Sequence, residues 1–237
     1  MPAVTVRTLQ IAGRTLRFAV SARREDERLG AVAAYEGRML RRLLAATRDG
    51  DTFFDVGANI GTVTLPVAVA GAAECLAFEP EHANASRLAE NAELNGLANV
   101  TVIEAAVWSE PGRVSLRIDG PVGSGTASAF AHGAGMAEVP AVTVDDFAGG
   151  GRAAPHVIKI DVEGAELEVL RGAEAALASG RVRDLFVEAH PVALAARGES
   201  ETELFSILES HGYAEVWATI RDTEAHRHFR HRSSQAP

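Results

Sequence analysis

Two pairs of ionisable residues stand near the ends of two apolar segments in the second half of the chain. Lys159 and Asp161 lie two positions apart in the first segment, and Glu188 and His190 lie two positions apart in the second. Residues two apart on a β-strand share a face, and charges inside an apolar strand are costly to bury without a partner or a purpose. Because the unperturbed histidine pKa, near ~6.5, suits removal of a hydroxyl proton, we predict that Asp161, Glu188 and His190 deprotonate or orient an acceptor hydroxyl. Lys159, the only lysine of the chain, is predicted to position Asp161.

Other interpretations of these residues stay open. Asp161, Glu188 and His190 are also a possible ligand set for Mg²⁺ or a similar ion that would acidify a substrate diol. The lysine–aspartate pair is alternatively a buried ion pair that only orders the sheet, and His190 is alternatively a cap at the end of a strand. Glu163 and Glu166 follow in the same motif, and we assign them to the N-terminus of the next helix rather than to chemistry.

A glycine turn follows the first apolar strand after position 50. The segment Asp55-Val56-Gly57-Ala58-Asn59-Ile60-Gly61 leads from that strand into the start of a helix. Gly57 and Gly61 allow a tight bend and close approach of a ligand, and the helix start offers free N–H groups to an anion. The turn departs from the dinucleotide pattern G-x-G-x-x-G, because Asn59 occupies the place of the second glycine. It therefore predicts a site for a nucleotide-like cofactor.

The next two strands end in acidic residues that complete this prediction. Glu79 ends the second strand, 22 positions beyond Gly57, where an acidic side chain can accept hydrogen bonds from both ribose hydroxyls. Glu104 and Ala105 lie near the end of the third strand, where the side chain or the nearby amides would hold an adenine. For Glu104, a solvated carboxylate at a strand end is an equally good interpretation.

These residues need a sheet that brings the strand ends to one edge. After Gly50, apolar strands alternate with helices, which predicts a parallel sheet covered by helices on both faces. The expected strands are 52–56, 74–78, 100–107, 157–160, 184–188 and 214–220, and the expected helices are 61–70, 83–95, 165–177 and 202–210.

The rest of the chain flanks this core. Before it, we predict a β-hairpin from 4–11 and 15–20, a polar loop over 21–30 and an amphipathic helix over 31–47. Short strands at 114–118 and 139–144 enclose the stretch Gly120–Gly135, which is rich in Gly, Ser and Ala and would be either a surface loop or a mobile lid. We divide the chain into an extension (1–50), a catalytic domain (51–221) and a partly disordered tail rich in Arg and His (222–237).

The glycine turn, the segment Phe78-Glu79-Pro80 and the motif from Lys159 to Glu166 resemble the FkbM family of S-adenosylmethionine-dependent methyltransferases. The resemblance implies a class I, Rossmann-like α/β fold with a mostly parallel seven-stranded sheet, helices on both faces, and an N-terminal hairpin and helix as an extension. A full fold of this class ends in an antiparallel strand pair, for which only the tail remains. The resemblance also implies methyl transfer, usually to a hydroxyl oxygen.

Carried over position by position, the resemblance assigns cofactor contacts to individual residues. The methionine part would lie in the turn formed by Asp55, Gly57, Asn59 and Gly61. The ribose would bind Glu79, and the adenine would lie beside Glu104 and Ala105. Asp161 would lie beside the sulfonium and the acceptor.

Composition limits the classes of protein that fit. The chain has 237 residues, one cysteine and a formal net charge of −9, which disfavour a disulfide framework and a nucleic-acid-binding protein. No apolar run approaches the ~18 residues of a membrane span, and we predict a cytoplasmic enzyme that could form a homo-oligomer. Its acceptor would be a hydroxylated small molecule or sugar. An NAD-dependent oxidoreductase and a catalytically silent binding module are the alternatives.

Overall fold

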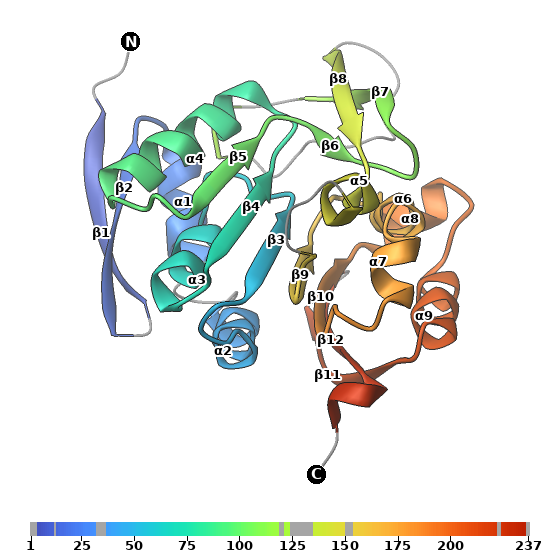
Figure 1. The fold of residues 1–237 in the computed structure, drawn as a ribbon. Helices are drawn as coiled ribbons and strands as arrows, with labels where there is room; N and C mark the ends of the chain where they lie inside the picture. The colour runs from blue at the N-terminus through green and yellow to red at the C-terminus, as the bar shows by residue number, and fades with distance from the viewer. Residues whose placement is uncertain are drawn as a thin grey trace.

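A seven-stranded sheet forms the centre of the molecule in the computed structural model (Figure 1). Five strands and the outer strand β11 run in one direction, and β12 runs antiparallel between β10 and β11. The order across the sheet is β11 (Tyr213–Arg221), β12 (Glu224–His231), β10 (Asp184–Ala189), β9 (Val157–Ile160), β3 (Thr52–Val56), β4 (Glu74–Phe78) and β5 (Val100–Ile103). The structure describes residues 4–11, 13–31, 37–118, 121–123, 135–149, 154–221 and 224–235.

Helices cover both faces of the sheet because neighbouring strand residues are apolar on both sides. Phe53 packs with Met39, Leu43 and Val67 on one face, and Phe54 packs with apolar side chains of the C-terminal helices on the other. The first face carries α2 (Gly37–Ala46), α3 (Thr64–Ala70) and α4 (His82–Leu94); the second carries α5 (Val144–Gly149), α6 (Glu166–Arg171), α7 (Glu174–Ala178), α8 (Pro191–Ala196) and α9 (Glu201–Ser210). This arrangement confirms the predicted fold class. Within the described residues, every helix falls short of the length and apolarity that a bilayer span requires.

The N-terminal extension packs on the first helical face. Strands β1 (Thr5–Ile11) and β2 (Arg14–Val20) form the predicted hairpin, which buries Phe18 against the α3 residue Leu65. The polar loop predicted over 21–30 is wrong, because Arg23–Ala31 forms helix α1. Glu25 accepts hydrogen bonds from the backbone N–H groups of Ser21 and Ala22, so its carboxylate satisfies amides at the start of the helix.

The C-terminal segment differs from the partly disordered tail that we predicted. Glu224–His231 forms β12, pairs with β10 and β11, and is followed by a short 3-10 helix over Arg232–Gln235. The ring of His228 stacks on Phe186 with centroids 4.1 Å apart, and its Nε2 lies 2.8 Å from Asp184 Oδ1. His228 is thus packed within the sheet.

Two predicted elements are each divided in two. The strand predicted over 100–107 is β5 in the main sheet followed by β6 (Ala106–Val107), which pairs with β8 (Met136–Val142) in a second sheet completed by β7 (Gly112–Arg117). The helix predicted over 165–177 is α6 and α7. Of the predicted lid Gly120–Gly135, only 121–123 and Gly135 are among the described residues.

Candidate functional site

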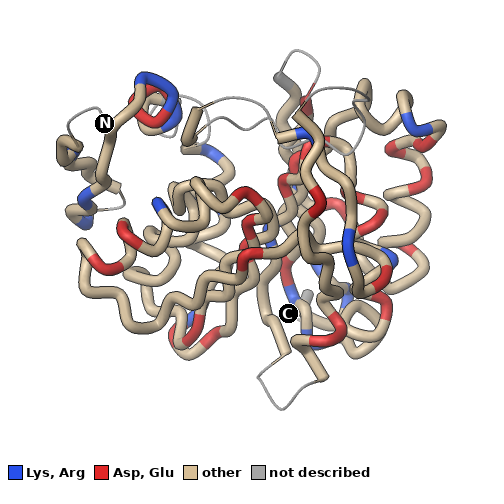
Figure 2. Tube along the Cα trace, turned by 90° about the horizontal axis from the view of Figure 1, so that it is seen from above, with Lys and Arg blue, Asp and Glu red and all other residues tan. Residues whose placement is uncertain are grey.

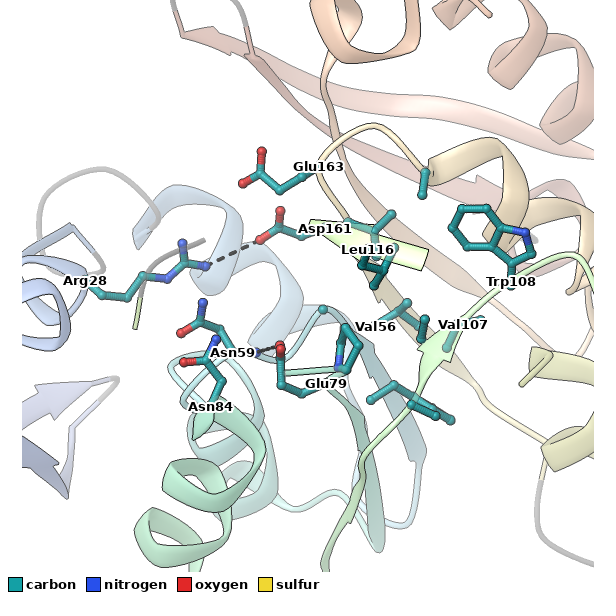
Figure 3. A pocket seen from close by; sticks show the side chains of 17 residues that line it. Arg28, Val56, Asn59, Glu79, Asn84, Val107, Trp108, Leu116, Asp161 and Glu163 are labelled. Atoms are coloured by element: carbon teal, nitrogen blue, oxygen red, sulfur yellow. Dashed lines mark hydrogen bonds and ion pairs between the residues drawn. The ribbon is translucent and has the colours of Figure 1, made fainter. Parts of the chain in front are cut away.

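A pocket opens at the carboxyl edge of the central strands, between the main sheet, α1 and the small second sheet (Figure 3). About 660 Å³ of space, open solvent at the mouth included, lies between its lining residues. Its polar side carries Arg28, Asn59, Glu79, Asn84, Asp161 and Glu163. Its apolar side carries Val56, Phe78, Val107, Trp108, Leu116 and Val162.

The turn after β3 presents its backbone to this pocket. Gly57 has φ of +78°, and a Cβ atom at this position would lie 1.8 Å from the carbonyl oxygen of Asp161. Only glycine therefore allows the ends of β3 and β9 to approach so closely. Asn59 also has positive φ, at +51°, and its side-chain oxygen accepts a hydrogen bond from the N–H of Ile60. The turn is thus fixed by its own backbone and lines the pocket with Gly57 and Asn59.

Glu79 is a buried carboxylate at the end of β4, where we predicted a ribose contact. Its Oε2 accepts a hydrogen bond of 2.8 Å from the N–H of Asn59, and its Oε1 accepts one of 2.9 Å from the N–H of Glu81. Burial raises the pKa of Glu79, while these backbone donors act in the opposite direction. Burial and the neighbouring Glu79 raise the pKa of Glu81 to about 7. Glu79 therefore offers hydrogen-bond acceptors at the pocket wall, next to the glycine turn.

Lys159 joins the two central strands beneath the pocket. Its Nζ lies 3.0 Å from Asp55 Oδ1 and 3.5 Å from Asp161 Oδ2, and it donates a 2.8 Å hydrogen bond to the carbonyl of Gly57. Burial opposes its charge, but the two aspartates raise its pKa. Asp161 faces the pocket, whereas the other oxygen of Asp55 accepts a hydrogen bond from Thr64 Oγ1. Lys159 thus holds the end of β9 against the glycine turn, as an internal cation.

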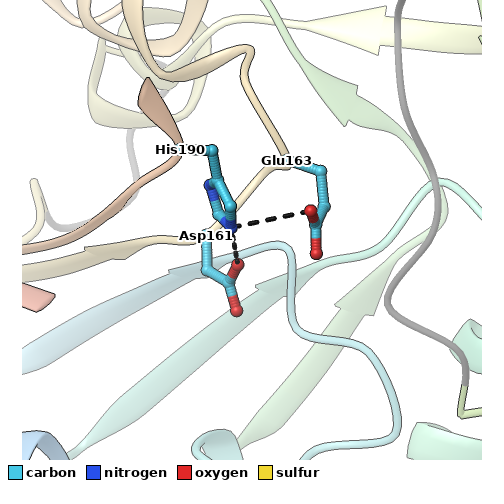
Figure 4. Close-up of side chains that lie close together, drawn as sticks. All are labelled: Asp161, Glu163 and His190. Atoms are coloured by element: carbon cyan, nitrogen blue, oxygen red, sulfur yellow. Dashed lines mark ion pairs between the residues drawn. The ribbon is translucent and has the colours of Figure 1, made fainter. Parts of the chain in front are cut away.

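The ring of His190 points toward Asp161 and Glu163 and forms an ion pair with each (Figure 4). Its Nε2 is 4.0 Å from Asp161 Oδ1 and 3.6 Å from Glu163 Oε2, while its Nδ1 is 2.6 Å from the buried Glu166 Oε1. Burial disfavours the imidazolium, but the hydrogen bond with Glu166 and the charges of the three carboxylates raise the pKa of His190 to about 10. A histidine with its pKa raised in this way holds its proton at neutral pH, which favours a role as a positive charge over the role of base that we predicted.

The two pocket carboxylates beside His190 have different pKa values. Burial opposes ionisation of Asp161, but Lys159, Arg28 and His190 lower its pKa to about 2. Burial and the nearby charge of Asp161 raise the pKa of Glu163 to about 7. Glu163 also has φ of +51°, a strained conformation for a non-glycine residue. The site therefore contains a fixed anion and a second carboxylate that titrates near neutral pH.

The predicted metal ligands do not form one cluster. Among the residues that the structure describes, two groups bring three candidate ligand atoms together, namely Asp161, Glu163 and His190, and Glu188, His190 and Glu224. The predicted trio of Asp161, Glu188 and His190 is neither of them. Both groups share His190, which would have to release its proton before it could bind a metal. The arrangement therefore does not support the predicted Mg²⁺ site.

Several residues predicted for the site do not line the pocket. Gly61 instead packs against α4, where a Cβ would lie 3.1 Å from Leu88 Cγ. The exposed Glu104 has its Oε2 2.9 Å from His82 Nδ1, because the strand has already ended at Ile103 and the chain turns outward. Ala105, the next residue, does line the pocket. Glu188 Oε2 lies 3.0 Å from Nε2 of His226, a cross-strand neighbour on the unpredicted strand β12.

Sequence reasoning missed three polar residues of the pocket. Arg28 lies on the unpredicted helix α1, Asn84 on the first turn of α4, and Glu163 was assigned to a helix N-terminus. For Glu163, the signal was present, because Asp161 and Glu163 are two apart directly after a strand. Arg28 and Asn84 had no such signal, since only tertiary packing brings them to the sheet edge.

The residues that line the pocket fit S-adenosylmethionine. In the view onto this edge, acidic residues run through the middle of the molecule with basic residues among them (Figure 2). Glu79 is suited to ribose hydroxyls, the apolar wall with Phe78 and Val107 to adenine, and the anionic Asp161 to a positively charged sulfonium. Gly57 and Asn59 line the same pocket, where the amino-acid end would lie.

Comparisons with known proteins found similar methyltransferases. The family model described as the methyltransferase FkbM domain matches residues 55–214. The chain is 31% identical over 182 residues to the hexuronic acid methyltransferase AglP of Haloferax volcanii. The aligned region covers 76% of this chain and 73% of that protein.

Solved structures support the fold. An rRNA methylase from Streptococcus thermophilus has a TM-score of 0.53 and 10% identity, covering 82% of this chain and 94% of that one. Magnesium protoporphyrin IX methyltransferase from Synechocystis PCC 6803, a structure with bound S-adenosylmethionine, has a TM-score of 0.51 and 15% identity, covering 82% and 77%. At these identities the likeness is one of architecture.

Proposed function

This chain belongs to the FkbM family of methyltransferases, and from that premise we propose that it methylates a hydroxyl oxygen of a sugar, with S-adenosylmethionine as donor. Family membership favours a methyltransferase over the NAD-dependent oxidoreductase that the sequence left open. The observation that carries the proposal is the meeting of Gly57, Glu79 and Asp161 in one pocket at the sheet edge. The relative named for hexuronic acid methylation supports a hexuronic acid as the acceptor class.

The pocket has two ends with different tasks. Glu79 and the apolar side with Phe78 hold the adenosine, and the turn at Asn59 holds the methionine part. Asp161 lies between this end and Glu163 (Figure 3), so the acceptor hydroxyl binds beside these two carboxylates. When bound, S-adenosylmethionine supplies an activated methyl group on a positively charged sulfur. The protein's main contribution is then to align the hydroxyl with that methyl group.

Glu163 is the proposed general base. Transfer forms a C–O bond, breaks the C–S bond with its electron pair staying on sulfur, and releases the hydroxyl proton to Glu163. A base is most useful when its pKa is near the working pH, and the pKa of Glu163 is about 7. Asp161 stays ionised and orients the hydroxyl, because its pKa of about 2 makes it a weak base. His190 provides positive charge behind both groups.

A methyl-transfer assay with labelled S-adenosylmethionine tests the function. We expect the full chain to methylate a methyl hexuronide, and mass spectrometry of the product to place the added methyl group on oxygen. Asp161→Asn should lose turnover and keep its affinity for S-adenosylhomocysteine, measured by calorimetry. Tight binding of S-adenosylhomocysteine without turnover on any hydroxylated acceptor would instead support the silent binding module.

A further inference from the structure

A second groove lies between the start of α8 and the ends of β11 and β12 that meet there. Its apolar lining consists of Pro191, Val192, Ile220 and Ala225. Val192 is 67% exposed and Ile220 is 75% exposed, the two highest values among the large hydrophobic side chains that the structure describes. Single exposed apolar residues are ordinary on a protein surface, whereas their gathering in one groove indicates a binding surface.

The sheet connects this groove to the proposed transfer site at Asp161. In the strand order β9, β10, β12 and β11, Asp161 follows β9 and His190 follows β10. On the two strands beyond, Ala225 pairs with Ile220. Glu224 lines the groove and has a ligand-type atom within 4.8 Å of one on His190. Because adjacent strands lie about 4.8 Å apart, Ile220 is three strand spacings from Asp161, on the order of 14 Å, which is farther than a single sugar ring extends.

The arginine of the groove has its charge compensated within the protein. Arg227 is 13% exposed, its Nη2 lies 3.0 Å from Glu201 Oε1, and its Nη1 lies 3.0 Å from Glu215 Oε2. Its guanidinium carbon also lies 4.7 Å from the ring centroid of Phe205. With the arginine neutralised in this way and Glu224 adding negative charge, the groove offers apolar contact rather than a site for an anion.

We propose that this groove binds an apolar aglycone of the acceptor, joined by a glycosidic bond to the sugar that receives the methyl group. The identity of that sugar rests on the proposed function. The reacting hydroxyl lies beside Asp161 and Glu163, and the rest of the acceptor extends past His190 to Val192 and Ile220. Each methylene group removed from water is worth about fourfold in affinity, so a hydrocarbon that reaches the groove should strengthen acceptor binding strongly.

The alternative occupant is a second copy of this chain, because β11 is an edge strand of the sheet. The register of β11 against β12 shifts between Glu215 and Trp217. Irregularities of this kind disfavour the pairing of an edge strand with another chain. The continuity of the groove with the transfer site therefore favours the acceptor.

Methyl transfer to two glucuronides tests the proposal on the full chain. The acceptors are methyl glucuronide and octyl glucuronide below its micelle-forming concentration, which differ only in the aglycone. The groove variant combines Val192→Thr with Ile220→Thr, two exposed positions where threonine keeps the branched Cβ. The matched control combines Val4→Thr with Val6→Thr, which are each 54% exposed. Val6 lies in β1 and Val4 directly before it, across the molecule from β11 (Figure 1).

In the wild type, we expect the KM for octyl glucuronide to be about tenfold or more below that for methyl glucuronide. The groove variant should raise the octyl KM about fivefold or more, with kcat and the methyl KM within twofold of the wild type. The control variant should match the wild type for both acceptors. Equal KM values for the two glucuronides in the wild type, or an unchanged octyl KM in the groove variant, would overturn the proposal.

Two further measurements separate the remaining outcomes. A wild-type dimer in light scattering that the groove variant abolishes would assign the groove to a second copy and would also overturn the proposal. Calorimetry measures binding of both glucuronides to the S-adenosylhomocysteine complex without turnover. Wild-type protein that binds octyl glucuronide more tightly than methyl glucuronide, yet methylates neither, would retain the groove and show that the proposed function is wrong.

Discussion

The two loops that meet at the pocket are built in different ways. The turn after β3 is held by backbone hydrogen bonds, with the N–H groups of Gly57 and Ala58 both donating to the carbonyl of Phe78. The loop after β9 is surrounded by charges, with Asp161 facing three cations and Glu163 facing His190. Backbone geometry does not titrate in the physiological range, whereas a set of close ionisable groups does.

This difference separates binding from chemistry. The cofactor end of the pocket depends mainly on the shape of the main chain, so it should respond most strongly to steric changes, and its titratable groups are Glu79 and Glu81. The acceptor end depends on the balance of charges around Asp161, so it should respond to pH and to substitutions that preserve shape. Lys159 connects the two, because it contacts the carbonyl of Gly57 and both aspartates.

Gly57→Ala is expected to have the largest effect. The added Cβ would overlap the carbonyl oxygen of Asp161, and no side-chain rotation relieves a clash with backbone. We expect a loss of roughly 5 kcal/mol or more in the free energy of unfolding, with S-adenosylhomocysteine binding abolished. Gly13→Ala is the matched control, because Gly13 has nearly the same φ, +77°, and open space around it. It should cost only about 1–2 kcal/mol and leave binding intact; similar losses for both variants would refute the steric argument.

Lys159→Met is expected to cause the next largest loss in the free energy of unfolding, since it removes the connection between the two loops. Removing one partner of a buried ion pair typically costs about 3–5 kcal/mol, because the remaining charge is left without compensation. Urea unfolding measures this loss. Adding Asp55→Asn to the same chain should recover part of it, because the double variant buries one charge fewer. A loss below about 1 kcal/mol in the single variant would mean that solvent, rather than Lys159, stabilises the aspartates.

The fold was predictable where local sequence and tertiary structure agree. The strands of the parallel sheet are short runs rich in apolar residues, and the glycine turn marks the carboxyl end of β3. Helix α1 was missed because its start depends on tertiary packing. Glu25 accepts a hydrogen bond from the backbone N–H of Ser21, and it is held there by an ion pair with Arg87, far away in the sequence. Strand β12 was missed because a run of histidines and arginines has a polar composition, and only pairing with Asp184 and stacking on Phe186 make it part of the sheet.

The site, like the fold, was predictable where local geometry alone determines it. The two-residue spacing of Lys159 and Asp161 correctly brought them to the same face, since strand geometry alone determines it. The protonation of His190 was not predictable, because it depends on Glu166, a residue 24 positions away that approaches its Nδ1. The outward turn of Glu104 depends on where β5 ends, and strand ends are the least certain part of a sequence prediction.

Glu163→Gln should have an intermediate effect, on turnover alone. We expect kcat to fall by about 100-fold, in the range typical of a lost general base, with S-adenosylhomocysteine affinity within twofold of the wild type. In the wild type, kcat should rise with pH through about 7, as Glu163 loses its proton, and E163Q should lack this rise. Glu104→Gln is the control, a strand-end carboxylate that lies outside the pocket. An unchanged pH profile in E163Q would mean that a group other than Glu163 accepts the hydroxyl proton.

The smallest expected effect is a pH dependence of stability that comes from His190. Its pKa is raised from 6.5 to about 10, so the folded state holds a proton that the unfolded state releases, and this contribution is complete below pH 6.5 and lost as pH rises towards 10. Between about pH 7.5 and 8.5, the free energy of unfolding should therefore fall by about 1.4 kcal/mol more in the wild type than in His190→Gln. The raised pKa of Glu163 acts mainly below this window, since it moves from 4.5 to about 7. Parallel stability curves for the two proteins would mean that His190 is neutral and available as a base, and would return it to the role that the sequence suggested.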